Sequence, residues 1–243
     1  MRLLVTRPMP DARETARELE AAGHEVVLEP LSRIVFGVDD PPDLATIQAL
    51  VATSRNGLRA VEHIPSLGRA RDKPLYAVGP ATASLARRMA FLTVHQGRGR
   101  ARDLPRLIAR RCRPRNGSLL HLAGARVAVD LKTPLAALGF DLIQRTLYRA
   151  EDAEAFSPAV VAALEQAAID GVILMSPASA RSYVRLITSH GLMAKAGGIA
   201  HFCLSEKVAR ALGEIPARTI RVSPEPNSQE LLALIGRGVT KSS

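Results

Sequence analysis

The sequence predicts an α/β fold of two similar domains, each a parallel sheet covered by helices. Short apolar runs recur along all 243 residues, and most are continuous rather than alternating, which is typical of strands buried on both faces. Residues at helical spacing separate these runs, and the order of motifs in one part of the chain is repeated in another. The composition, 47% hydrophobic and 23% charged, excludes disorder and fibrous folds.

The elements alternate along the chain. Strands are predicted at 3–6, 25–31, 49–54, 74–79, 92–96, 118–124, 141–148, 171–176, 200–205 and 219–223. Helical spacing joins Ala12, Ala16 and Leu19; Leu104, Leu107 and Ile108; Leu131, Leu135 and Leu138; Val208, Ala209 and Leu212; and Leu231, Leu232 and Ile235. Gly23 and Gly139 are expected to end the first and third of these helices.

An internal repeat divides the strands. Segment 14–31 matches 129–148 as helix, glycine and strand, while segment 50–83 matches 172–209 as strand, serine motif, helix and strand. About ten strands are too many for one sheet, so the repeat predicts two domains of about five strands each. The periodicity alone allows contiguous or interleaved halves.

Serine motifs follow two of the predicted buried strands. TSRNG at 53–57 and MSPAS at 175–179 each open a helix, so Ser54, Asn56, Ser176 and Ser179 stand beside unpaired N–H groups at the carboxyl ends of strands. Such positions bind carboxylates or phosphates. The alternative interpretation is that these side chains only cap their helices.

The neighbouring strand ends carry further candidates. Gly79 allows close backbone approach and Thr82 lies one turn into the next helix, while Ser205 stands at the corresponding point of the other half. Arg7 follows the first strand, where its guanidinium could bind a carboxylate in a bidentate manner. A turn glycine and a solvated surface arginine are the alternative interpretations.

The net charge of +10 indicates an anionic partner, and most of the 33 basic residues are arginine. Eight arginines fall within 98–115, opposed only by Asp103. This run is interpreted as a basic loop with a solvated helix face, or as an attractor of an anionic ligand or nucleic acid. The scarcity of aromatic residues argues against single-strand binding. The sequence contains no P-loop, GxSxG or HExxH motif.

The cysteines and histidines indicate neither a disulfide framework nor a metal site. Cys112 and Cys203 are far apart and are expected to be free thiols in a reducing cytoplasm, and the histidines are scattered. No apolar run is long enough to span a bilayer, and Pro and acidic residues near the N-terminus argue against a signal peptide. We expect a cytoplasmic protein without a membrane anchor.

The ordered set of motifs resembles the uroporphyrinogen-III synthase family, of a bacterial type. The resemblance rests on VTRP, AAGHEVVLEPL, TSRNGLRA, YAVGPATA, LLHLAG, LAALGFDLIQRTLYRA, MSPASA, CLSEKVARAL and PNSQELLALI, which run the whole length of the chain in order. It implies two α/β domains joined by a two-stranded linker, which crosses at about 31–36 and returns at about 146–150. Domain one is then 1–34 plus 149–243, and domain two is 35–148.

The resemblance also implies a reaction. Linear hydroxymethylbilane closes to uroporphyrinogen III with loss of water and inversion of ring D, in heme biosynthesis, which makes the enzyme a lyase. Tyr148 matches the family's tyrosine near the cleft and is the candidate general acid; a packing tyrosine of the linker is the alternative. Cleft-lining positions are matched by Thr53, Ser54, Asn56, Gly79, Thr82, Ser176, Pro177 and Ser179. Some relatives carry a Gly-Pro-Thr-Thr turn where this chain has Ser205, Glu206, Lys207 and Val208. This departure weakens any role that needs a hydroxyl at Lys207, although its ammonium can serve as the carboxylate partner instead.

The expected partner is therefore a small polycarboxylate, hydroxymethylbilane, together with a transient contact with the preceding enzyme of the pathway. No cofactor, metal, nucleic acid or membrane is expected, and a monomer is the default. Two other functions remain as alternatives: a non-catalytic two-domain binder of an anionic ligand, and nucleic-acid binding through the arginine run 98–115.

Overall fold

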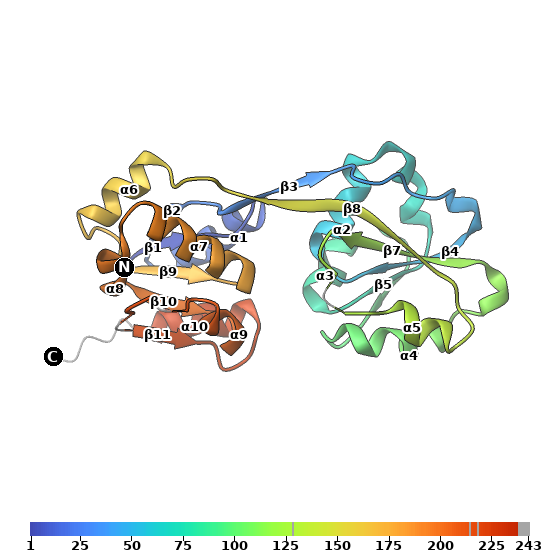
Figure 1. The fold of residues 1–243 in the computed structure, drawn as a ribbon. Coiled ribbons are helices and arrows are strands. Elements are labelled where there is room, and N and C mark those ends of the chain that lie inside the picture. The colour runs from blue at the N-terminus through green and yellow to red at the C-terminus, as the bar shows by residue number, and fades with distance from the viewer. Residues whose placement is uncertain (128, 214, 218, 238–243) are drawn as a thin grey trace. The chain divides into compact units, whose positions relative to one another are not determined.

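The chain folds as two α/β units, which a computed structural model describes for residues 1–127, 129–213, 215–217 and 219–237. Unit 1 comprises Met1–Arg33 and Glu151–Ser243, and unit 2 comprises Ile34–Ala150. The chain passes from one unit to the other within two strands, β3 (Ser32–Phe36) and β8 (Leu142–Asp152), which are neighbours in one sheet (Figure 1).

Unit 1 is built on a five-stranded sheet in the order β11-β10-β9-β1-β2, in which every neighbouring pair is parallel. Its strands are β1 (Arg2–Val5), β2 (Glu25–Leu28), β9 (Gly171–Leu174), β10 (Ala200–Cys203) and β11 (Thr219–Val222). Its helices are α1 (Asp11–Ala21), α6 (Pro158–Glu165), α7 (Pro177–Ser189), α8 (Met193–Gly197), α9 (Glu206–Arg210) and α10 (Ser228–Arg237).

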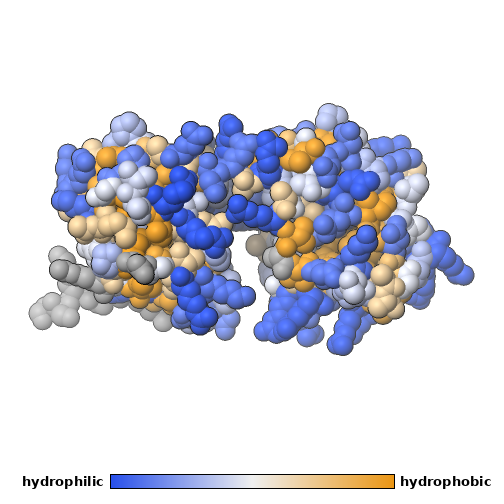
Figure 2. All heavy atoms as spheres, viewed as in Figure 1, coloured by the Kyte–Doolittle hydropathy of each residue, from blue (hydrophilic) through white to orange (hydrophobic). Residues whose placement is uncertain are grey.

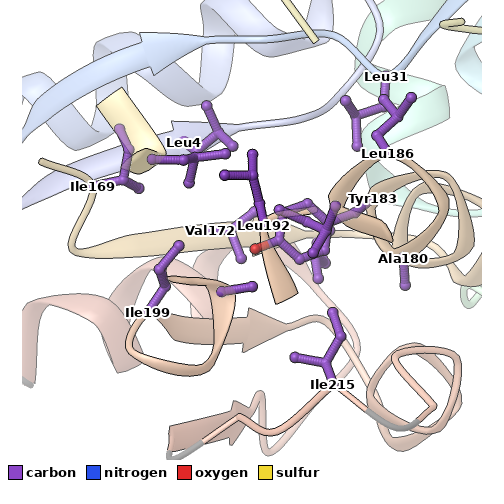
Figure 3. Packing of buried hydrophobic residues seen from close by; sticks show 14 of the residues in the cluster. Leu4, Leu31, Ile169, Val172, Ala180, Tyr183, Leu186, Leu192, Ile199 and Ile215 are labelled. Atoms are coloured by element: carbon purple, nitrogen blue, oxygen red, sulfur yellow. The ribbon is translucent and has the colours of Figure 1, made fainter. Parts of the chain in front are cut away.

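Both faces of this sheet are buried at its central strands β1, β9 and β10. Leu4 and Val172 belong to one apolar cluster, which includes Tyr183 and Leu186 of α7 (Figure 3). Leu3, Val5 and Ile173 point to the opposite face, where they pack against α1 and α10. Because adjacent residues serve opposite faces, the strands have to be apolar without interruption. The prediction of parallel strands covered on both faces is confirmed.

Unit 2 is built on a six-stranded sheet in the order β3-β8-β7-β4-β5-β6. Its further strands are β4 (Ile47–Ala52), β5 (Leu75–Ala77), β6 (Val94–Gln96) and β7 (Ser118–Gly124). Its helices are α2 (Arg55–His63), α3 (Pro80–Arg88), α4 (Leu104–Ala109) and α5 (Lys132–Ala136), with short 3-10 turns at Leu44–Thr46, Pro65–Asp72, Ala101–Asp103 and Pro114–Asn116. Two apolar clusters again cover the two faces.

The two sheets share one strand order. Without β3, the order β6-β5-β4-β7-β8 of unit 2 matches β11-β10-β9-β1-β2 of unit 1. The β7–α5–β8 segment corresponds to β1–α1–β2, although it comes last in its unit and β1–α1–β2 comes first. The predicted repeat of two similar α/β domains is therefore confirmed, and both predicted free thiols, Cys112 and Cys203, are buried and free.

One predicted helix is shorter than its spacing indicated. The spacing predicts that Leu138 shares a helical face with Leu131 and Leu135, but α5 ends at Ala136 and Leu138 is 45% exposed. Gly139 adopts a φ of +82°, and its N–H donates to the carbonyl of Ala136. This left-handed residue turns the chain toward β8 and ends the helical face before Leu138.

A buried histidine makes the stability of unit 1 depend on pH. His201 on β10 is 0% exposed, and burial lowers its pKa to about 4. Because the folded state disfavours the charged form, stability is complete above the unfolded pKa near 6.5 and is lost as the pH falls toward 4. We expect His201 to account for about 3 kcal/mol of this loss. Thermal melts across pH 4–7.5 should give a flatter profile for His201→Leu than for the wild type, and parallel profiles would contradict this assignment.

Candidate active site

Polar side chains gather at the carboxyl edge of the unit 2 sheet, where β4, β7 and β8 lie side by side. The crossovers diverge here, since β4 leads through α2 to β5 while β7 leads through α5 to β8. Ligands of open α/β sheets bind at such a switch point, beyond the carboxyl ends of the strands. Ser54 follows β4, Gly124 ends β7 and Tyr148 lies on β8.

The side chain of Tyr148 reaches across the end of β7 to Ser54. Its Oη lies 2.7 Å from Oγ of Ser54. Gly124 stands opposite Tyr148 in the register of β7 and β8. A Cβ atom at position 124 would lie 2.5 Å from Cζ and 2.8 Å from Oη of the tyrosine. The ring can take this position only because residue 124 has no side chain.

The phenol of Tyr148 is held in its neutral form. Burial raises its pKa above the ordinary value of 10.0, and the hydrogen bond with Ser54 opposes this in part. Oγ of Ser54 also accepts a hydrogen bond from the N–H of Gly57 at 3.1 Å, so its own proton can be donated to Oη. In that arrangement the proton of Tyr148 is left for another acceptor.

An aromatic contact supports the tyrosine ring from β3. The ring of Phe36 lies 6.4 Å from that of Tyr148, tilted by 51°, and it stacks on His63 of α2 at 4.2 Å. Such contacts add a directional preference to the burial of the rings. Tyr148 is therefore positioned by Gly124, Ser54 and Phe36 together.

A second polar chain connects the same three strands. Oγ1 of Thr53 lies 3.0 Å from Nε2 of His121, whose Nδ1 lies 3.3 Å from Oε1 of Gln144. Because the amide oxygen only accepts, Nδ1 carries the proton and Nε2 accepts from Thr53. His121 is 1% exposed, and burial lowers its pKa, which favours this neutral form. His121 was not predicted as a site residue, since it is a lone polar residue within an apolar run of the sequence.

The other predicted positions of unit 2 lie on the starts of α2 and α3. Oδ1 of Asn56 accepts a hydrogen bond from Arg59 at 2.7 Å. Gly79 precedes α3, and a Cβ atom there would lie 2.9 Å from Cα of Gly99, so the missing side chain makes room for the backbone of Gly99. Thr82 is only 5% exposed and lies on the buried side of α3.

In unit 1 the second serine motif takes the same conformation as the first. Ser176 caps α7 with φ −151° and ψ 153°, and its Oγ accepts from the N–H of Ser179 at 3.0 Å. Ser54 caps α2 with φ −149° and ψ 159° through Gly57. The hydroxyls of Ser176 and Ser179 bond each other, and Pro177 is the first residue of the helix. Both serines thus cap their helices, and Ser54 in addition bonds Tyr148.

The remaining candidates of unit 1 differ in exposure. The Arg7 guanidinium donates to Thr15 at 3.0 Å and to Asp11 at 3.3 Å, so it anchors the start of α1. Its side chain is 14% exposed. Ser205 precedes α9 without capping it through its side chain, and Lys207 lies exposed in the first turn.

The described part of the chain contains no helix that is long and apolar enough to cross a membrane. Within the same residues, no three His, Cys, Asp or Glu side chains gather closely enough to hold a metal ion. The site of unit 2 consists of hydroxyl, amide and neutral imidazole groups around the partly buried phenol of Tyr148. Such groups can donate hydrogen bonds to an anion and transfer a proton.

The chain is similar to known proteins over nearly its whole length. The family model described as "Uroporphyrinogen-III synthase HemD" matches residues 13–233. The solved structure of uroporphyrinogen-III synthetase from Helicobacter pylori is 17% identical with a TM-score of 0.61, and the match covers 97% of this chain and 98% of that one. A mutant uroporphyrinogen III synthase from the extremely thermophilic bacterium Thermus thermophilus is 14% identical with a TM-score of 0.50, over 98% and 96% of the two chains. At these identities the solved structures support the fold alone. Comparison with curated proteins finds no match.

Proposed function

Since the chain belongs to the uroporphyrinogen-III synthase family, we propose that Tyr148 and the polar strand ends carry out the family's cyclisation of hydroxymethylbilane to uroporphyrinogen III. The observation that carries this assignment is the partly buried Tyr148 hydroxyl, held at the switch point of unit 2 by Ser54 and Gly124. The reaction eliminates water, so the enzyme is classed as a lyase.

The chemistry requires one proton and a defined geometry. The hydroxyl of the hydroxymethyl group on ring A takes a proton and leaves as water, and the remaining methylene forms an electrophilic azafulvene. Ring D attacks through its substituted α-carbon to form a spiro intermediate, which then fragments and recloses with ring D inverted. Without the enzyme the chain closes to the uninverted isomer, so the protein's main task is to hold the correct carbon against the electrophile. Holding reacting atoms at about 3–3.5 Å can contribute roughly 7–11 kcal/mol.

Tyr148 is assigned as the proton donor to the leaving hydroxyl. Its pKa is raised by burial, so the phenol keeps its proton at neutral pH. Ser54 can donate to Oη while Tyr148 donates to the substrate, which stabilises the phenolate that forms as the C–O bond breaks. The proton released when the closed macrocycle regains its pyrroles restores the phenol.

The eight carboxylates of the substrate are assigned to the helix starts of both units. Ser54, Ser176 and Ser179 lie at capped N-termini, where N–H groups and the helix dipole favour negative charge. Lys207 adds an exposed cation after β10. We propose that the protein acts in the cytoplasm as a monomer without a cofactor, and that it receives its unstable substrate through transient contact with the preceding enzyme.

Serine substitutions separate binding from capping. We expect Ser54→Ala and Ser176→Ala each to lower the free energy of unfolding by about 0.5–2 kcal/mol, because both hydroxyls cap a helix. If the two hydroxyls also bind substrate, each substitution weakens the binding free energy for uroporphyrinogen III by about 1.5–3 kcal/mol. Thermal melts and product titrations on both variants measure the two effects, with Ser84→Ala on α3 as the control. Lower stability with unaltered affinity at both positions would restrict the serines to capping.

The cyclase assignment is tested by mixing the pure protein with freshly prepared hydroxymethylbilane and separating the product isomers. Isomer III is the expected product. If isomer I is the only product, the cyclase assignment is wrong and the non-catalytic binder of an anionic ligand is the alternative that stands. A duplex-binding assay at several salt concentrations tests the nucleic-acid alternative, because phosphate contacts would make the duplex affinity fall steeply as salt increases.

A further inference from the structure

A hollow lined by arginines lies in unit 2, outside the Ser54–Tyr148 site. It has a volume of about 340 Å³, and its polar lining consists of Gln96, Gly97, Arg98, Asp103, Arg106 and Arg110. Gln96 ends β6 and is followed by Gly97 and Arg98, while Arg106 lies on α4 and Arg110 directly follows the last residue of that helix. It occupies the part of the chain that contains the arginine-rich run.

Positive charge dominates this hollow. The three arginines are exposed, and Asp103 is the one acid among the lining residues. Within the described residues, none of the three guanidiniums forms an ion pair with a carboxylate. Hydrophilic side chains also cover the part of unit 2 where α4 lies (Figures 1 and 2). The hollow is therefore suited to an anion that can pair with several guanidinium groups at once.

The backbone holds this hollow at the carboxyl edge of the sheet, the edge that also carries Ser54. Gln96 is the last residue of β6, which runs parallel to β5 as β5 does to β4. The N–H groups of Gly97 and Gly99 donate to the carbonyls of Ala77 and Val78, both at 2.8 Å. Neighbouring strands are about 4.8 Å apart, so β6 lies roughly 10 Å from β4 along this edge. Four linked pyrrole rings extend beyond that distance.

We propose that this arginine hollow binds carboxylate side chains of the tetrapyrrole, while the reacting rings lie at Ser54 and Tyr148. The inference rests on the proposed function, because the ligand is the octacarboxylate that the reaction converts. Arg98, Arg106 and Arg110 act as binding residues through planar guanidinium forks that match carboxylates. The hollow thus gives the excess arginine of the run 98–115 a role in substrate affinity rather than in chemistry.

The test is the double variant Arg106→Gln/Arg110→Gln, with Arg100→Gln/Arg102→Gln as control. The control removes the same charge from exposed arginines of the same run that do not line the hollow. At an ionic strength of about 0.05 M we expect the hollow variant to raise KM for hydroxymethylbilane about tenfold relative to the control, with kcat unchanged. At about 1 M the difference should nearly vanish, because charges are then screened beyond about 3 Å.

A direct titration with uroporphyrin III, the stable oxidised octacarboxylate, tests ligand binding by the hollow independently of catalysis. We expect its affinity to fall about tenfold in the hollow variant and to stay within twofold of wild type in the control. If the wild type produces isomer III but the two variants have equal KM values, the proposed binding role of the hollow is wrong and the proposed cyclase function stands. If the wild type makes only isomer I, the proposed function is wrong. Equal uroporphyrin affinities of the hollow variant and the control variant would then show that the binding role of the hollow is wrong as well. Loss of duplex affinity without loss of uroporphyrin affinity would assign the hollow to nucleic acid instead.

Discussion

Tyr148→Phe is expected to lower kcat by about 10²–10⁴-fold while the fold stays intact, because the substitution removes the proposed general acid. The phenyl ring can still pack over Gly124 and against Phe36. Ser54 still caps α2 through the N–H of Gly57. Single-turnover measurements with hydroxymethylbilane give the rate, and a thermal melt checks the fold.

Tyr183→Phe is the control, since it removes the same atom from a buried tyrosine of the other unit. Tyr183 packs in the core of unit 1 against Phe156 and His201, apart from the unit 2 site. We expect this control to keep the wild-type rate. A Tyr148→Phe rate within about threefold of wild type would remove the residue from acid catalysis and leave substrate positioning as the whole mechanism.

Gly124→Ala is expected to abolish most activity through its effect on Tyr148. The added Cβ would lie within 2.5–2.8 Å of three atoms of the tyrosine, so the ring has to move and its hydrogen bond with Ser54 is lost. Overpacking at a buried site also costs about 1–3 kcal/mol of stability. We expect kcat to fall by at least the amount seen for Tyr148→Phe.

Two comparisons identify the cause of that loss. Gly68→Ala is the control, because no atom lies within 4 Å of a Cβ built there and the residue belongs to the same unit. If Gly124 acts through the tyrosine hydroxyl, Gly124→Ala should lower kcat little further in a Tyr148→Phe background. Multiplicative losses in the double variant would show that Gly124 affects turnover independently of Tyr148.

The architecture was predictable because burial on both faces leaves a clear pattern. Residues 3–5 and 171–174 are apolar without interruption, and the structure uses alternate residues for opposite faces. The helices α6 and α8 were not predicted. The apolar residues of α6 surround the helix instead of forming a stripe, and α8 is only five residues long. A periodicity argument detects neither pattern.

The site was predictable residue by residue, but its contacts were not. Ser54 and Tyr148 were selected for separate reasons, and their hydrogen bond depends on the register that sets Tyr148 opposite Gly124. That register shifts between Ala123 and Gly124, and no sequence pattern specifies the shift. The ion pair of Arg7 was not predictable either, since Arg7 lies before α1, where the i,i+4 spacing of a helix does not apply.

The cyclase assignment is tested most directly by the isomer composition of the product at increasing protein concentration. Spontaneous closure of hydroxymethylbilane competes with the enzyme and yields isomer I. Without protein the fraction of isomer III should therefore be near zero, and it should approach one at protein concentrations where enzymatic turnover is faster than spontaneous closure. Tyr148→Phe should need far more protein to reach the same fraction. A product that remains isomer I at every concentration of folded wild-type protein would contradict the assignment.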